Sequence, residues 1–230
     1  MIKKITGASK VYTFDHTLRS TESTTKNVFK GADEGGKMKA AAPANRVHGD
    51  YTAQSAPDKF TSLAKVPAFN GTTVPEEEVK AMMKKRYMFI NVWRNVDHYP
   101  VIKKPLAFCD FKSVDYDSID ELEIRYEHRI GRNYAFDITK EQYKQHKWWY
   151  FPMCKREECL MFKCYDKSQA EGNPRFVMHG AFDHPDTPAD ALPRSSLECR
   201  SIAVWEDEDC PEPVENMMIN ESGRSVKKVA

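Results

Sequence analysis

Short strand-like segments follow one another from Tyr87 onward, and this succession most restricts the possible folds. Alternating apolar and polar residues predict a β-hairpin from 122–126 to 134–138, with its turn at Gly131-Arg132-Asn133, and further strands at 87–94, 106–110, 148–151, 159–165, 175–182 and 196–205. Paired parallel strands need a crossover of a dozen or more residues, usually a helix. Because no such strand–helix rhythm appears, the sequence predicts a mainly β fold with antiparallel strands.

The residues before Tyr87 show a less regular pattern. Residues 10–15 and 47–51 alternate as strands do, whereas 57–64 and 75–86 have the composition of helices. The second of these helices starts at Pro75 with three glutamates and ends in basic residues, as the helix dipole favours. Residues 16–45 are polar without periodicity, which predicts a flexible loop. We expect one domain over 1–205 and a polar tail over 206–230.

Charge and hydropathy exclude several kinds of protein. The 35 basic and 34 acidic residues leave a net charge of +1, unlike a dedicated binder of nucleic acid or anionic membranes. Residues 146–150 interleave bases with aromatic rings, as single-stranded nucleic-acid sites do, but this charge balance argues against that function. The chain has neither a roughly 20-residue apolar span nor a secretory signal, and its six cysteines lack metal-binding spacing. We therefore expect a cytoplasmic protein with free thiols.

The segment Arg46-Val47-His48-Gly49-Asp50 carries the first candidate site. Side chains at i and i+2 of an extended strand point to the same face, so His48 and Asp50 project together. Gly49 between them has no side chain, which permits a close approach of a neighbouring group. A second histidine would complete a 2-His-1-carboxylate site of the kind that binds Fe(II) with open coordination positions. On its own the tripeptide is weak evidence for a metal site, and a solvated strand edge is the more common explanation.

Histidines and an arginine later in the chain can complete this site. His179 lies among apolar residues of a predicted strand and is favoured over His184, which precedes a proline in a turn. Arg194 and Ser196 open the next strand and can present a guanidinium and a hydroxyl to a carboxylate. A surface arginine beside a turn is the alternative. Arg200 lies at even spacing from Arg194 and shares its face if the strand is regular.

The order of these motifs, together with the surrounding residues, resembles the Fe(II)/2-oxoglutarate-dependent oxygenases. The similarity is to the hydroxylase/desaturase family of microbial and fungal secondary metabolism and extends over about residues 4–205. The segments that carry it are 12–19, 46–52, 90–94, 105–110, 149–152, 160–166 and 193–204. Several motifs in the same order make the resemblance more specific than the His48 motif alone.

This resemblance implies a fold, a cofactor and a reaction. The fold would be a double-stranded β-helix, a jelly-roll or cupin-like barrel with a few flanking helices, and its iron ligands would be His48, Asp50 and His179. Arg194 with Ser196 would bind the carboxylate of 2-oxoglutarate, with Arg200 as the alternative anchor. The reaction would hydroxylate or desaturate a small specialised metabolite with O2, converting 2-oxoglutarate to succinate. Neither a nucleic acid nor a membrane partner is expected, and the sequence sets no oligomeric state.

The chain also departs from the family pattern. Family members have a longer region before the segment that begins at Gly7, and residues 20–44 and the charged tail differ from theirs. His16 and Arg19 follow the first predicted strand, where a solvated loop is favoured over a position in the pocket. These departures keep a second function open: a catalytically silent or 2-oxoglutarate-independent metal-binding barrel that binds a small molecule or a protein partner.

Overall fold

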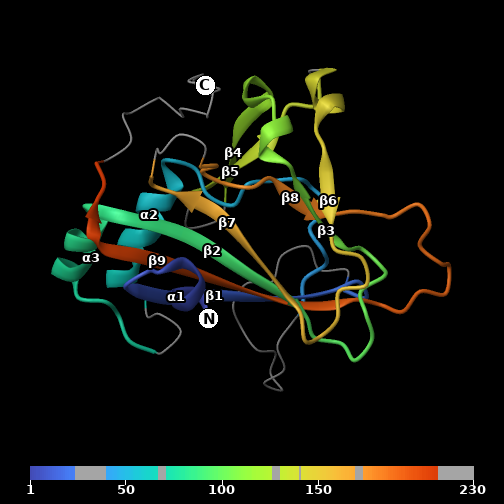
Figure 1. The fold of residues 1–230 in the computed structure, drawn as a ribbon, viewed down its shortest axis with the longest axis horizontal. Helices are drawn as coiled ribbons and strands as arrows, with labels where there is room; N and C mark the ends of the chain where they lie inside the picture. Colours follow the sequence, from blue (N-terminus) through green and yellow to red (C-terminus); the bar gives the residue numbers. More distant parts are fainter. Residues whose placement is uncertain (24–39, 67–70, 126–129, 140, 169–172, 212–230) are drawn as a thin grey trace.

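Three antiparallel sheets form most of the fold in the computed structural model, which describes residues 1–23, 40–66, 71–125, 130–139, 141–168 and 173–211 (Figure 1). A four-stranded sheet has the order β1-β9-β2-β7, a three-stranded sheet the order β6-β3-β8, and β4 pairs with β5. The strands are β1 (Lys10–Ser20), β2 (Lys85–Asn95), β3 (Leu106–Cys109), β4 (Ile119–Arg125), β5 (Ile130–Phe136), β6 (Trp148–Tyr150), β7 (Cys159–Asp166), β8 (His179–Ala181) and β9 (Ser195–Asp209). The mainly β, antiparallel prediction is confirmed.

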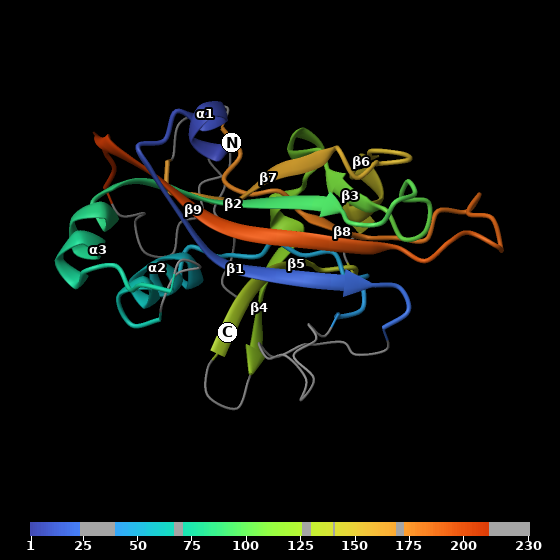
Figure 2. The ribbon, with the colours of Figure 1, turned by 90° about the horizontal axis from the view of Figure 1, so that it is seen from below.

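Helices are short and lie outside the sheets. They are α1 (Ile2–Thr6), α2 (Ser55–Thr61), α3 (Glu76–Met83) and the 3-10 turns Ser62–Ala64, Phe111–Ser113, Tyr116–Ser118 and Glu141–Gln145. In both views α2 and α3 lie at one end of the four-stranded sheet, whereas β3, β6 and β8 lie toward the other end (Figures 1 and 2). No helix in the described part of the chain is long and apolar enough to cross a membrane.

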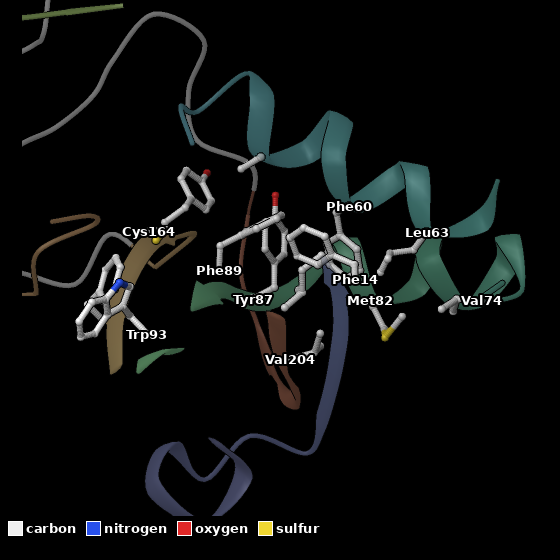
Figure 3. Packing of buried hydrophobic residues seen from close by; sticks show 14 of the residues in the cluster. Phe14, Phe60, Leu63, Val74, Met82, Tyr87, Phe89, Trp93, Cys164 and Val204 are labelled. Atoms are coloured by element: carbon white, nitrogen blue, oxygen red, sulfur yellow. The ribbon is translucent and has the colours of Figure 1, made fainter. Parts of the chain in front are cut away.

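One face of the four-stranded sheet is divided into an apolar half and a polar half. In the apolar half, Phe89 and Val204 belong to one buried cluster with Phe60 of α2 and Met82 of α3 (Figure 3). Trp93 and Cys164 lie at the end of this cluster remote from Val74. The polar half continues along the same strands through aligned, alternating positions: Asp15, Thr17 and Arg19 of β1, Ser196, Glu198 and Arg200 of β9, and Asn91, Trp93 and Asn95 of β2.

Several element boundaries differ from the prediction. Strand β1 continues through Ser20, so the predicted loop at 16–45 does not begin at His16, and 24–39 lie outside the described residues. Its last residues are polar, yet each pairs with β9, down to Ser20 opposite Ser195. Strand β9 runs to Asp209, which is paired with Lys85 of β2, so the predicted tail does not begin at 206. Residues 212–230 are also outside the described part.

The predicted turn of the hairpin, the end of α3 and the extents of two strands also differ from the structure. Gly131 pairs with Ile124 inside β5, so the predicted hairpin exists but its turn is not at 131–133. Helix α3 ends at Met83, and 85–86 instead begin β2. The predicted strand at 47–51 is reduced to isolated bridges at His48 and Gly49, and that at 175–182 to β8.

Candidate metal centre

His48 and His179 are brought together by a two-way backbone contact. The His48 N–H donates to the His179 carbonyl at 3.0 Å and the His179 N–H donates to the His48 carbonyl at 3.0 Å. Residues that exchange both bonds in an antiparallel pair lie directly opposite each other with their side chains on one face. Gly180 permits this approach, since a Cβ there would lie 3.3 Å from the Arg46 carbonyl oxygen. Gly49 is likewise enclosed, by the side chains of Met178, Phe176 and Tyr134.

The side chains of His48, Asp50 and His179 converge on one point. One nitrogen or oxygen atom from each lies within 4.8 Å of the others. His48 Nε2 is 3.2 Å from Asp50 Oδ1, and the two imidazole centroids are 4.5 Å apart. The i,i+2 prediction for His48 and Asp50 is therefore confirmed in geometry. His184 is not in the group; its Nδ1 accepts the Asp186 backbone N–H at 3.1 Å in the turn.

Backbone carbonyls set the tautomer of both histidines. His48 Nδ1 lies 2.8 Å from the Arg46 carbonyl oxygen and His179 Nδ1 lies 3.0 Å from that of Val177. A carbonyl oxygen only accepts hydrogen bonds, so each Nδ1 carries a proton and the neutral ring has its lone pair at Nε2. The same i–2 contact thus orients both Nε2 atoms as metal ligands.

Three protein groups hold the outer oxygen of Asp50. Its Oδ2 accepts a hydrogen bond from Asn91 Nδ2 at 2.7 Å and from the Cys164 thiol at 3.6 Å, and Arg200 Nε lies 3.9 Å away. Oδ1 is the oxygen that faces His48. The carboxylate is therefore oriented to offer one oxygen to a metal, with the other bound in an outer shell.

Electrostatics keep Asp50 ionised in this buried position. Burial raises the pKa of Asp50, but the hydrogen bond that protonated His48 donates, the charges that His179 and His48 carry when protonated, and the charge of Arg200 outweigh it, so the pKa lies well below its usual range. Burial and the neighbouring His48 lower the pKa of His179, which favours the neutral imidazole. Burial also lowers the pKa of His48, but Asp50 outweighs this effect and the net shift is upward. An ionised carboxylate beside imidazoles is the donor set of a divalent transition metal.

Asn91 is expected to position Asp50. Asn91→Ala removes the 2.7 Å hydrogen bond to Oδ2 and should weaken metal binding by about 10- to 100-fold, as loss of an outer-shell partner does. Anaerobic calorimetry with Fe(II) measures this change. The control is Asn95→Ala, because Asn95 lies in the same strand but its amide donates to the Tyr99 carbonyl. An Asn91→Ala affinity equal to that of the wild type would contradict the positioning role.

Arg194 and Ser196 are buried and incompletely partnered. They are 2% and 1% exposed, and both Arg194 Nε and Ser196 Oγ have no hydrogen-bond partner in the described structure. Arg194 Nη1 donates to the Lys104 carbonyl, and the guanidinium lies 5.5 Å from the Trp93 ring centroid. Arg194 Nε and Ser196 Oγ can therefore donate hydrogen bonds to a carboxylate.

Arg200 is surrounded by acidic groups. Its guanidinium contacts Glu198 at 2.6 Å, Asp15 at 3.4 Å and Asp50 at 3.9 Å, and donates to Thr17 at 2.8 Å. Arg200 is thus occupied by protein partners, in contrast to Arg194.

An aromatic row leads from the triad to the surface. Cross-strand pairing places Trp149 opposite Phe108, Phe108 opposite His179, and His179 opposite His48, so these side chains share one face. Phe162 of β7 adds a ring 4.7 Å from that of His179. Trp149, at the outer end, is 64% exposed. The triad therefore has charged groups on one side and aromatic rings on the other.

Three residues of the site were not assigned by sequence reasoning. Asn91, Cys164 and Glu198 contact Asp50 or Arg200, but each comes from a different strand. The i,i+2 spacing of Asn91 and Trp93 puts them on one face of β2, and only the tertiary pairing puts that face beside Asp50.

These features define a mainly β protein with a 2-His-1-carboxylate cluster between paired strands. The family model described as "Oxidoreductase/YMDC permease-like domain" matches residues 1–204, and the chain belongs to this family.

Two named relatives and a solved structure are similar to this chain over most of its length. The chain is 31% identical to "Hydroxylase/desaturase CTB9" of Cercospora beticola, covering 91% of this chain and 62% of that protein. It is 29% identical to "Hydroxylase/desaturase efuI" of Hormonema carpetanum, covering 91% and 68%. The solved structure described as "iron and alpha-ketoglutarate-dependent endoperoxidase NvfI with different conformation" matches with a TM-score of 0.69 and 27% identity over 88% of this chain and 63% of that one. The chain thus spans between 62% and 68% of the length of these proteins.

Proposed function

We propose that this chain is a non-haem Fe(II)- and 2-oxoglutarate-dependent oxygenase that hydroxylates or desaturates a small specialised metabolite with O2. The observation that carries the proposal is the convergence of His48, Asp50 and His179 within 4.8 Å. Two imidazoles and one carboxylate suit Fe(II) and leave coordination positions open. Relatives named hydroxylase/desaturase and Fe(II)/2-oxoglutarate-dependent dioxygenase support the same reaction class.

The donors around the triad also fit 2-oxoglutarate. Arg194 Nε and Ser196 Oγ are buried without partners, and a carboxylate accepting from both would satisfy them. Arg200, by contrast, is saturated by Glu198, Asp15 and Asp50, so we favour Arg194 as the anchor and assign Arg200 to the support of Asp50. When bound, Fe(II) would use O2 and 2-oxoglutarate to supply the oxidising chemistry that activates a C–H bond, with succinate and CO2 as co-products.

The roles of the protein's own residues follow from their contacts. His48, Asp50 and His179 would hold the metal, and Asn91 would keep Asp50 Oδ1 directed inward. Arg194 and Ser196 would fix one end of the co-substrate, so that its position does not depend on the metal alone. Phe108 and Phe162, beside His179, would exclude water and contact an apolar part of the substrate.

Within this proposal the fold is a double-stranded β-helix, with the helices flanking the barrel. The domain would extend from residue 1 to the end of β9 at Asp209. A small-molecule substrate and O2 are the proposed partners. The expected cytoplasmic location and lack of nucleic-acid and membrane partners stay predictions.

An anaerobic titration tests the proposal. Fe(II) followed by 2-oxoglutarate should produce a weak visible charge-transfer band, and admission of air should release succinate. His48→Ala should lose the band, whereas His184→Ala, the turn histidine, should keep it. Folded protein that binds Fe(II) but gives no band would indicate a 2-oxoglutarate-independent barrel. A band without succinate in air would indicate a catalytically silent one.

A further inference from the structure

Arg19 is a second arginine beside Arg194 and Ser196. It lies in β1 directly opposite Ser196 of β9, so the two side chains are on the same face of the sheet. The pairing continues to Thr21, whose N–H donates to the Arg194 carbonyl at 3.0 Å and whose Oγ1 accepts from the Arg194 N–H at 2.9 Å. Arg19 and Arg194 therefore flank Ser196 from adjacent strands.

The nearby carboxylates do not neutralise these two arginines. Asp15 and Glu198 form their ion pairs with Arg200 instead. Among the residues that the structure describes, Arg19 Nη1 donates to the Ala42 carbonyl at 2.7 Å and Arg194 Nη1 to the Lys104 carbonyl, both neutral acceptors. No described carboxylate lies within ion-pair distance of either guanidinium.

Each guanidinium is affected by burial and by the other charges. Burial, followed by the positive charge of Arg19, lowers the pKa of Arg194 to about 10. Burial is also the largest cause of the lowered pKa of Arg19. Two cations held together in a poorly hydrated site cost free energy, and an anion between them removes that cost. The unpartnered Arg194 Nε and Ser196 Oγ are donors for the same anion.

We propose that Arg19 joins Arg194 and Ser196 in binding one carboxylate group, and that this added arginine strengthens the preference of the resulting clamp for dicarboxylic over monocarboxylic 2-oxo acids. The proposal rests on the proposed function, because the clamp would take the carboxylate of 2-oxoglutarate farthest from the oxo group. A planar guanidinium presents parallel N–H donors to a carboxylate, and a second one doubles the charge at that end of the site. Arg19 is then a specificity-determining residue.

Calorimetric titration of Zn(II)-loaded protein with 2-oxoglutarate and with pyruvate tests the clamp without turnover. Pyruvate keeps the 2-oxo acid group but lacks the distal carboxylate. Arg19→Gln should lower the affinity for 2-oxoglutarate about tenfold and leave that for pyruvate unchanged, because only the former reaches the clamp. Arg94→Gln is the matched control: this exposed arginine of β2 donates to the Arg156 carbonyl at 2.5 Å. It should change neither affinity.

Arg19→Lys provides a second variant in case the glutamine variant does not fold. Lysine keeps the positive charge but lacks the paired N–H donors of the guanidinium. The affinity for 2-oxoglutarate alone should therefore fall less, by about three- to fivefold. Equal losses for both acids, or no loss for either, would overturn the clamp while leaving the oxygenase proposal intact. Zn(II)-loaded wild type that binds no 2-oxoglutarate would overturn both the clamp and the oxygenase proposal. The titration of the wild type therefore separates a failure of the oxygenase proposal from a failure of the clamp alone.

Discussion

Asp50→Ala is expected to lower the affinity for Fe(II) by more than about a hundredfold, which exceeds the usual contribution of an outer-shell partner. The variant removes the only anionic ligand of the triad, and its Oδ1 is the oxygen that faces His48. The two remaining imidazoles supply no charge to offset the metal, and Asn91 Nδ2 loses its acceptor. Anaerobic competition against a chromophoric chelator measures the change over this range.

The loss of metal should not be a loss of the fold. The His48–His179 backbone bridge that builds the site does not involve the Asp50 side chain, and Arg200 retains Glu198 and Asp15 as partners. We therefore expect a cooperative unfolding transition for Asp50→Ala. Asp110→Ala is a suitable control, since Asp110 only caps a 3-10 turn through the Lys112 N–H. A dissociation constant within about tenfold of the wild type would place the metal elsewhere.

The sequence predicts those parts of the fold that depend on local alternation. Aromatic residues recur at period two in β2, apolar residues (Leu160, Phe162, Cys164) do so in β7, and Ile202 and Val204 do so in the second half of β9; all three strands were found. The end of β1 was missed because its inward residues are charged or polar. They fit a strand only because Arg200 and Glu198 of β9 meet them across the sheet.

The same distinction separates the predicted from the missed residues of the site. His48 and Asp50 are two residues apart, so their spacing predicts that they lie together, and they do so although only isolated bridges at His48 and Gly49 remain of the predicted strand. Asn91 reaches Asp50 from 41 residues away and Arg200 reaches Asp15 from 185 residues away. No local pattern records such contacts. Whether Arg194 or Arg200 binds a carboxylate likewise could not be decided from their shared face, because the choice depends on which one the protein's own acids already neutralise.

Arg200→Met should destabilise the protein whereas Arg194→Met should not, which makes the pair a test of the co-substrate anchor. Arg194 is a buried cation with an unpartnered Nε and no carboxylate at ion-pair distance in the described chain. An apolar side chain of similar length removes that cost and can pack on Trp93, so the free energy of unfolding without ligand should be unchanged or higher. Affinity for 2-oxoglutarate should fall by about a hundredfold or more, because charge-assisted hydrogen bonds are lost.

Arg200→Met should instead destabilise the protein by about 3–5 kcal/mol, because it leaves the carboxylates of Glu198, Asp15 and Asp50 together without their cation. Fe(II) binding should weaken with it, since Asp50 loses an outer-shell partner. Urea unfolding of the unliganded variants and calorimetry with 2-oxoglutarate on Zn(II)-loaded protein separate the two effects. If Arg200→Met folds as stably as the wild type and loses 2-oxoglutarate while Arg194→Met still binds it, the anchor is Arg200. If instead Arg194→Met loses 2-oxoglutarate without losing stability and Arg200→Met is destabilised, Arg194 is the anchor and Arg200 supports the metal ligand Asp50. This is the expected result, because Glu198, Asp15 and Asp50 already neutralise Arg200, which therefore attracts a further carboxylate only weakly.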